Sequence, residues 1–170
     1  YGLPRQTLES LDRTLDLAIQ LSPSRFAVFG YAHVPWMKPH QKLIDEKTLP
    51  EGSLRSEMAQ RVTDRLVGAG YVRIGLDHYA RPGDALAVAA TNGKLQRNFQ
   101  GYVADKSSSV IGVGASAISS LPRGFTQNVA DPAQYMAGIS ECGFATARGI
   151  GLTDDDRLRG TIIERLMCDN

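Results

Sequence analysis

The sequence predicts an α/β protein whose strands and helices alternate to form part of a parallel barrel or open sheet. The first indication is a set of segments in which apolar residues recur every three or four positions, as on one face of a helix. The second is a set of short apolar runs between those segments, which are typical of strands buried on both faces. A length of 170 residues allows one core and only part of a complete barrel.

Helices are expected wherever this periodicity is sustained, and the first and last of them have N-terminal capping signals. Thr7 is a suitable N-cap for the first helix, and the acidic run that follows Thr153 forms a capping box for the last. The last helix carries Leu158, Ile162, Ile163 and Leu166 on one stripe, which is expected to pack on a part of the protein absent from this chain. The expected helical segments are residues 7–20, 53–67, 84–91, 134–139 and a segment that begins at 153.

Strands are expected at residues 26–29, 71–76 and 110–113, each a short apolar run between helical segments. The character of the sequence changes beyond Pro122, and a domain boundary is expected near residues 144–152. Residues 1–143 would then form one domain with accessory strands, and residues 144–170 a linker and the first helix of a C-terminal domain. The first four residues lack an initiator Met, which favours a piece cut from a longer protein.

Composition and charge exclude several classes of partner. Nineteen basic and eighteen acidic residues leave a net charge of +1, so no global field attracts nucleic acid or an anionic membrane. The longest uncharged stretch is too rich in Ser, Gly and Ala to span a bilayer. The two cysteines, Cys142 and Cys168, form neither a CxxC clip nor a disulfide framework, and reduced thiols fit a cytoplasmic protein.

Loops at the carboxyl ends of the expected strands are the candidate ligand sites, namely residues 30–37, 77–84 and 112–120. In the first loop, Gly30 and Ala32 allow a ligand to approach the backbone, while Tyr31 and Trp36 offer surfaces on which a flat heterocycle can stack. The alternative is a packed loop whose aromatic side chains simply fill a core. Both interpretations remain open at this stage.

The second loop contains Asp77 beside His78, which are an acid–base pair only if both side chains reach one face. Neighbours on a strand point to opposite faces, so a structural role is the alternative. Arg81 is held extended by the proline that follows it. Its guanidinium could face a carboxylate-bearing ligand or be pinned to a nearby helix C-terminus.

A guanidinium, two carboxamides and two aromatic rings lie within residues 97–102, and this set can stack an aromatic ligand and bond its polar edge. An exposed hairpin edge is the alternative. Residues 112–117 lack the spacing and the Lys-Ser/Thr pair of a phosphate loop. No catalytic triad, zinc motif or calcium loop is present in the sequence, so no catalytic residue or metal ligand is assigned.

Several unusual strings occur in a fixed order along the chain, and together they are specific. They are YGLPRQT, VFGYAHVP, GLDHYARPGDALAVA, LQRNFQGY and IGVGASAIS. In this order they resemble the second half of the oxygen-independent coproporphyrinogen III oxidases (coproporphyrinogen dehydrogenases), a family of radical S-adenosylmethionine enzymes. The resemblance extends from Tyr1 to about Cys168. Gln96 and Tyr79 depart from it, since the family often has His and Phe at these positions.

The resemblance implies the C-terminal portion of a partial (β/α) barrel of the radical S-adenosylmethionine type. It implies that the parent protein uses a 5′-deoxyadenosyl radical to decarboxylate coproporphyrinogen III oxidatively to protoporphyrinogen IX in haem biosynthesis. Its cofactors would be S-adenosylmethionine and a [4Fe–4S] cluster whose cysteine ligands lie upstream. The electron donor and acceptor remain unidentified, and the isolated piece is expected to be inactive.

Site residues follow from the same resemblance. Ala32 and Ile118 match positions that contact S-adenosylmethionine, and Tyr31 lies beside the first of these. Phe99 and Gln100 match a pair near a second S-adenosylmethionine. The two candidates for recognition of the substrate propionates, whose role the resemblance does not fix, are Arg81 and Arg97.

Two other functions remain as alternatives. A haem chaperone, or another radical S-adenosylmethionine paralogue without decarboxylase activity, would keep the fold and lose the reaction. A purely structural or interaction domain is the other, because a piece without cluster cysteines makes no radical. Production of 5′-deoxyadenosine by the isolated piece would contradict the second alternative.

Overall fold

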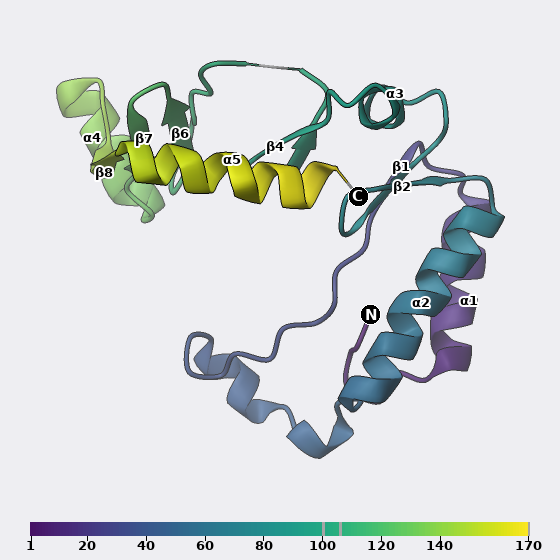
Figure 1. Ribbon diagram of the computed structural model, residues 1–170. Helices are drawn as coiled ribbons and strands as arrows, with labels where there is room; N and C mark the ends of the chain where they lie inside the picture. Colours follow the sequence, from purple (N-terminus) through teal and green to yellow (C-terminus); the bar gives the residue numbers. More distant parts are fainter. Residues whose placement is uncertain (100, 106, 170) are drawn as a thin grey trace. The chain divides into compact units, whose positions relative to one another are not determined.

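A computed structural model of the chain describes residues 1–99, 101–105 and 107–169. The chain divides into two compact units, Tyr1–Gly93 and Lys94–Asp169, and each is described by itself. Figure 1 shows that helices and short strands occur in both units. The α/β class predicted from the sequence therefore holds for each unit separately.

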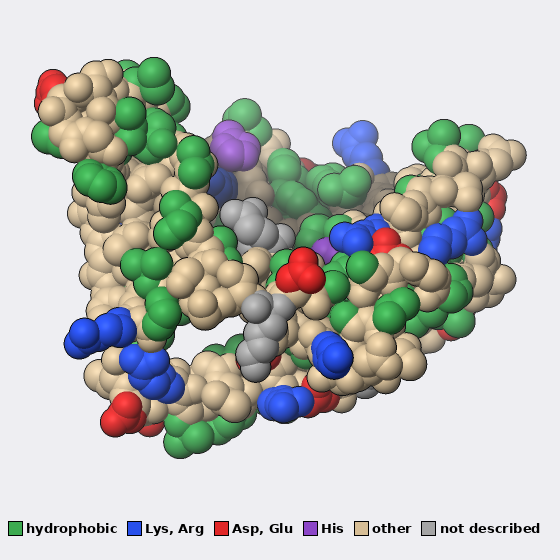
Figure 2. Space-filling model, turned by 90° about the horizontal axis from the view of Figure 1, so that it is seen from above, with side chains coloured by type: hydrophobic (Ala, Val, Ile, Leu, Met, Phe, Trp, Pro, Cys, Tyr) green, Lys and Arg blue, Asp and Glu red, His purple; other side chains and the backbone are tan. Residues whose placement is uncertain are grey.

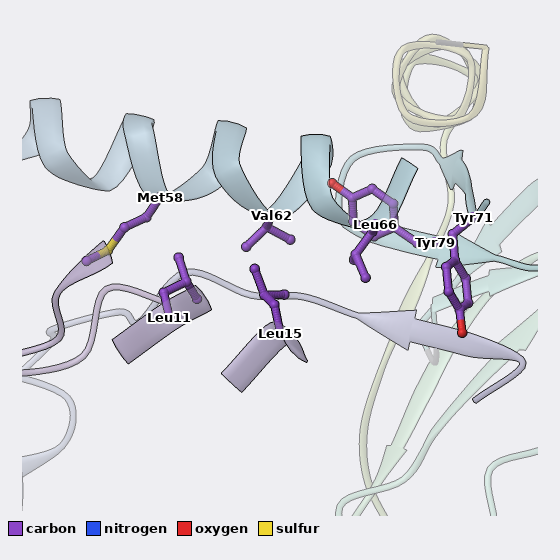
Figure 3. Close-up of a cluster of buried hydrophobic side chains, with 7 residues drawn as sticks. All are labelled: Leu11, Leu15, Met58, Val62, Leu66, Tyr71 and Tyr79. Atoms are coloured by element: carbon purple, nitrogen blue, oxygen red, sulfur yellow. The ribbon is translucent and has the colours of Figure 1, made fainter. Parts of the chain in front are cut away.

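The core of the first unit lies between two helices, α1 (Leu8–Gln20) and α2 (Gly52–Gly68). Thr7 caps α1 as predicted, since its hydroxyl accepts from the Ser10 amide. Figure 3 shows side chains of α2 pointing toward those of α1. The buried cluster consists of Leu11, Leu15, Met58, Val62, Leu66, Tyr71 and Tyr79. Burying each large apolar side chain contributes about 1.5–3 kcal/mol to stability.

The sheet of the first unit is antiparallel, which corrects the parallel arrangement expected from the sequence. Its strands are β1 (Arg25–Ala27), β2 (Val72–Ile74) and β3 (His78–Ala80), in the order β1-β3-β2. Only residues 75–77 connect β2 to β3, and so short a connection makes a hairpin rather than a crossover. The expected burial of the first strand on both faces is also wrong, because two of the three residues of β1 are exposed.

Smaller elements complete the first unit. Helix α3 (Ala85–Thr91) begins at the expected place, with the Asp84 carboxylate accepting from the Leu86 amide, and it ends before Gly93, whose φ is +63°. Two 3-10 helices that the sequence analysis did not anticipate are η1 (Pro39–Leu43) and η2 (Glu46–Thr48). They follow the first candidate loop directly, so they position it.

The second unit contains two antiparallel sheets. Strands β4 (Gln96–Asn98) and β5 (Gly101–Val103) form a hairpin, but their residues are half-buried or buried, so the exposed hairpin edge left open for residues 97–102 is only partly met. The second sheet has the order β6-β7-β8. Its strands are β6 (Ile118–Leu121), β7 (Gly124–Asn128) and β8 (Thr146–Gly151).

The predicted strand at residues 110–113 is wrong. Only Val110 pairs there, through a bridge in which its amide and carbonyl bond to Ser120. The apolar run instead precedes a turn in which Ser116 has a φ of +61° and Gly114 one of +108°. That turn delivers the chain into β6, so Ile118 lies at the start of a strand.

Helices α4 (Pro132–Cys142) and α5 (Asp154–Cys168) belong to the second unit. The capping box at Thr153 is confirmed, because the Asp156 carboxylate accepts from the Thr153 amide while the Thr153 hydroxyl accepts from the Asp156 amide. The apolar stripe of α5 is exposed among the described residues. Its members are Leu158, Ile162, Ile163 and Leu166. The expected domain boundary near residues 144–152 falls inside this unit and stays a prediction.

Charged side chains of both signs are interspersed on the surface. In the described part of the face that Figure 2 shows, Lys and Arg side chains lie among Asp and Glu side chains, without a broad area of one sign. This arrangement agrees with the net charge of +1. Among the described helices, none combines the length and the apolar character that crossing a membrane would demand.

Candidate functional site

The loop that carries Tyr31 and Ala32 is held by side chains from other segments of the first unit. The Tyr31 amide donates to the Tyr1 carbonyl at 2.7 Å, and Arg55 on α2 donates through Nη2 to the Tyr31 carbonyl at 2.9 Å. Gln41 donates through Nε2 to the Ala32 carbonyl at 3.1 Å. The loop follows β1 without forming regular structure, so these bonds define its path.

The aromatic residues of this loop have different environments. Trp36 is 75% exposed, so it does not fill a core among the described residues of its unit. Tyr31 is half-buried, and its hydroxyl lies 3.2 Å from Nδ1 of His33. The other ring nitrogen of His33 lies 3.2 Å from the Glu46 carboxylate. The exposed indole favours the stacking interpretation, whereas Tyr31 belongs to a polar chain that ends on η2.

Asp77 and His78 form a hydrogen-bonded pair, with Oδ1 and Nδ1 2.6 Å apart. The expectation that they point to opposite faces is wrong, because Asp77 lies in the turn before β3 rather than within the strand. Asp77 also lines a cavity of about 340 Å³ in the first unit. The carboxylate orients the imidazole.

Arg81 makes contacts within the first unit. Its Nη2 donates to the Ser22 hydroxyl at 2.6 Å, and its Nη1 lies 3.4 Å from the carbonyl of Ala69, the C-cap of α2. The guanidinium carbon lies 4.2 Å from the centre of the Tyr71 ring. These contacts match the second alternative of the sequence analysis, attachment to a helix C-terminus.

Arg97 in the second unit has a different environment. It lies on β4, and its guanidinium carbon is 5.1 Å from the centre of the Tyr102 ring on β5. Its Nη1 is buried and has no hydrogen-bond partner among the described residues. A buried donor without a partner costs about 1–3 kcal/mol. An anionic ligand would remove this cost.

Two pockets of the second unit share aromatic residues. A pocket of about 240 Å³ is lined by Phe99, Ile118 and Phe125, together with parts of β7 and β8. A larger pocket of about 530 Å³ is lined by Arg97, Phe99 and Phe125, and by residues of α5. The rings of Phe99 and Phe125 meet edge to face, with their centres 5.1 Å apart. Aromatic side chains therefore form a wall that both pockets share.

The turn that leads to Ile118 is fixed by polar side chains. Asn128 donates through Nδ2 to the carbonyls of Gly112 and Gly114, at 3.2 and 3.0 Å. The Gly112 amide donates to the hydroxyl of Ser119, whose residue is buried. Residues 112–117 thus have a defined conformation set by β6 and β7, and this conformation positions Ile118.

The structure brings some of the predicted site residues together. Phe99 and Ile118 line one pocket, and Phe99 and Arg97 line the next. Tyr31 and Ala32 lie in the first unit, as does Arg81. Gln100, the remaining predicted residue, lies outside the described residues.

Sequence reasoning missed three residues that shape these sites, namely Phe125, Asn128 and Gln41. Phe125 faces Phe99 only because β6 and β7 pair, and the sequence analysis did not predict either strand. Asn128 and Gln41 are polar residues whose bonds go to the backbone of distant loops. What marks Gln41 is its burial between loop residues, and burial is not visible in the sequence.

Metal ligands are not grouped in this chain as far as the structure describes it. Within residues 1–99, 101–105 and 107–169, no three His, Cys, Asp or Glu side chains are placed to hold a metal ion. Both cysteines are free, Cys142 exposed and Cys168 buried. Burial, together with nearby Glu164 and Asp169, raises the pKa of the Cys168 thiol.

Known proteins resemble this chain over almost its whole length, although no protein-family model matches it. Oxygen-independent coproporphyrinogen III oxidase from Bradyrhizobium diazoefficiens is 51% identical over 99% of this chain and 38% of its own length. The protein of the same name from Cereibacter sphaeroides is 50% identical over 99% of this chain and 37% of its own length. The chain therefore spans less than two fifths of these relatives.

A solved structure shows the same relationship. Coproporphyrinogen III oxidase from Escherichia coli, described as a radical SAM enzyme, superposes with a TM-score of 0.92 at 42% identity. The match covers 99% of this chain and 39% of that one. The resemblance identified from the sequence is thus confirmed, and so is the predicted α/β fold as part of the fold of a radical SAM enzyme.

Proposed function

Because 99% of this chain aligns with oxygen-independent coproporphyrinogen III oxidases, we propose that it forms part of a site that decarboxylates coproporphyrinogen III. The reaction would convert two propionate side chains oxidatively to vinyl groups and give protoporphyrinogen IX in haem biosynthesis. S-adenosylmethionine, reduced by a [4Fe–4S] cluster, supplies the radical chemistry when it is bound. The described residues offer no ligand set for the cluster, so the role of this chain is to bind and orient.

The observation that carries this proposal is the shared pocket of Phe99 and Ile118. Both residues match S-adenosylmethionine positions of the family that the sequence resembles, although Phe99 lies in the turn after β4 and Ile118 begins β6. The phenylalanine ring is 55% exposed, and Phe125 supports it edge to face. An exposed ring held in one orientation is suited to stack an adenine or methionyl group. Gln100 is proposed to bind beside it.

Arg97 is the proposed propionate-binding residue. Its unpartnered Nη1 belongs to a side chain that lines the 530 Å³ pocket, next to the aromatic wall. Asp105 and Glu164 line the same pocket and would repel a propionate, so binding depends on the guanidinium. Arg81 was the other candidate, but its donors already contact Ser22 and Ala69.

The test uses the full-length protein, purified anaerobically and supplied with S-adenosylmethionine, a reductant and coproporphyrinogen III. Formation of the divinyl product, followed by mass spectrometry, is the expected result. Arg97→Gln is expected to raise KM for coproporphyrinogen about 10–100-fold, as expected for loss of a charge-assisted bond. Arg159→Gln, at an exposed arginine of α5, is the matched control and is expected to leave KM for coproporphyrinogen unchanged.

A haem chaperone with the same fold is the alternative function. It would bind haem and transfer it without forming vinyl groups. Neither the wild-type protein nor Arg97→Gln would then form the divinyl product. The absence of product from a protein that binds S-adenosylmethionine and transfers haem would overturn the proposed reaction. A role as a structural domain predicts that the protein neither binds S-adenosylmethionine nor turns over substrate.

The remaining expectations belong to the same proposal. A cytoplasmic location is supported by the two free cysteines. The mixed surface charge supports the absence of nucleic acid and membrane among its partners. An electron donor and an acceptor are required by the reaction. Residues 1–143 would form barrel and accessory strands, and residues 144–170 would lead into a C-terminal domain.

A further inference from the structure

Gln41 joins two backbone groups of the loop that precedes it. The side chain comes from η1, and its Oε1 accepts from the Val34 amide at 2.6 Å. Its Nε2 donates to the Ala32 carbonyl at 3.1 Å. The residue is 9% exposed, one of the few buried polar residues among those described. One amide side chain therefore holds the backbone on both sides of His33.

This arrangement resembles the pairing of a strand, with a side chain in place of the partner. Ala32 is itself exposed, and the loop has no regular structure over residues 28–34. The position of Gln41 is set in turn by η1, where its own amide donates to the Lys38 carbonyl at 2.9 Å. The side-chain amide of Gln41 resists a flip, because a flip would place its NH2 group against the Val34 amide and its oxygen against the Ala32 carbonyl.

We propose that Gln41 is a positioning residue that fixes the Ala32 backbone for contact with S-adenosylmethionine. The inference rests on the proposed function, because the contact at Ala32 comes from the resemblance. Ala32 has only a methyl side chain, so a ligand there meets backbone atoms, and the orientation of those atoms decides affinity. Arg55 holds the preceding carbonyl, of Tyr31, so the peptide groups flanking Ala32 are fixed by two long polar side chains.

The test compares two substitutions of Gln41 in the full-length protein under anaerobic conditions. Gln41→Met keeps the length of the side chain and removes both bonds, so KM for S-adenosylmethionine is expected to rise about tenfold. KM for coproporphyrinogen and kcat are expected to change less than twofold. Gln60→Met, at an exposed glutamine of α2 whose side chain donates to Asp64, is the matched control.

Gln41→Glu provides a readout that a merely structural role would not move. Its ionised carboxylate accepts from Val34 but repels the Ala32 carbonyl, whereas its protonated form can donate to that carbonyl. Burial of this position and the nearby Ala32 carbonyl are expected to raise the pKa of the introduced carboxyl above its ordinary value of about 4.3, so the affinity of the variant for S-adenosylmethionine is expected to increase as the pH falls from 8 toward 5. The wild-type affinity, measured in parallel, is expected to change less over the same range.

The outcomes separate this inference from the proposed function. If the wild-type protein binds no S-adenosylmethionine, the proposed function fails and the inference fails with it. If the wild-type protein binds and Gln41→Met binds equally well, only the positioning role is overturned. Should Gln41→Met fail to fold, the pH response of Gln41→Glu decides, and a flat response would overturn the role.

Discussion

The phenol oxygen of Tyr79 on β3 lies 2.8 Å from the hydroxyl oxygen of Thr63 on α2. The Thr63 hydroxyl also lies 3.1 Å from the Ala59 carbonyl, which can only accept. Since a hydroxyl has one hydrogen, Thr63 donates to Ala59 and accepts from Tyr79. Tyr79 stands where the family commonly has Phe, so its hydroxyl adds a bond between sheet and helix at the edge of a mainly apolar cluster.

The first prediction concerns this bond. Tyr79→Phe is expected to lower the free energy of unfolding by about 1 kcal/mol, because one bond is lost and no polar group is left unpaired. Thr63→Val is expected to cost more, about 1–3 kcal/mol, because the phenol remains buried without an acceptor. The double variant should match Tyr79→Phe closely. Urea unfolding measures all three, with the exposed Thr14→Val as control, and additive effects would contradict the pairing.

The second prediction concerns Asp84, which connects β1 to α3. Its carboxylate accepts from Arg25 Nε at 2.7 Å and from the Leu86 amide at 2.8 Å. The bond from Arg25, followed by the amide, lowers the pKa of Asp84. A lowered pKa in the folded state adds stability above the pKa of the unfolded state, and this stability is lost as the pH falls through the folded-state value.

Asp84→Asn keeps an acceptor for the helix cap and removes the charge, so it is expected to cost about 0.5–1 kcal/mol at pH 7. Asp84→Ala removes both and is expected to cost about 1–2 kcal/mol. The difference between wild type and Asp84→Asn should shrink below about pH 4, where carboxylates ordinarily protonate. Thermal unfolding from pH 3 to pH 7 checks this, and a difference independent of pH would refute the role of the charge.

The helices could be predicted from the sequence because their signals are local. Thr7 caps α1 through Ser10, and Thr153 caps α5 through Asp156, each within three residues. The apolar stripe of α2 likewise needs only its own periodicity to identify its buried face. Such features do not depend on distant segments, so a single sequence contains them.

The strands were less predictable because each depends on a partner. Val110 belongs to an apolar run, yet only an isolated bridge forms there, while β8 pairs with β7 although all its residues are exposed. The site follows the same division. Phe99 and Ile118 were found through resemblance, whereas Phe125 was missed, because its contact with Phe99 arises only when β7 forms.

The third prediction concerns the reactivity of the two cysteines. Cys142 at the end of α4 is exposed, whereas Cys168 is buried and its pKa is raised, first by burial and then by Glu164. A raised pKa leaves less thiolate at pH 8, and the thiolate is the reactive form. Iodoacetamide is expected to label Cys142 at least about ten times faster, as measured by peptide mass spectrometry. Equal rates in the folded protein would contradict this, while equal rates in urea are expected.

The last prediction compares two glycines in the second unit. A β-carbon on Gly112 would lie 2.6 Å from the Ile118 carbonyl oxygen, so alanine there requires the backbone to move. A β-carbon on Gly160, within α5, would meet no atom within 4 Å. Gly160→Ala is therefore expected to raise the free energy of unfolding by about 0.5–1 kcal/mol, through the better helix propensity of alanine.

Gly112→Ala is expected to act in the opposite direction, because the displaced backbone is that of Ile118 itself. The Gly112 amide donates to the Ser119 hydroxyl, and the Gly112 carbonyl accepts from Asn128. Moving the Gly112 backbone to relieve the clash would therefore strain these two hydrogen bonds. We expect both lower stability and weaker binding of S-adenosylmethionine by the full-length protein. Urea unfolding and equilibrium binding measure the two effects, and normal affinity in a destabilised Gly112→Ala variant would separate the turn from the site.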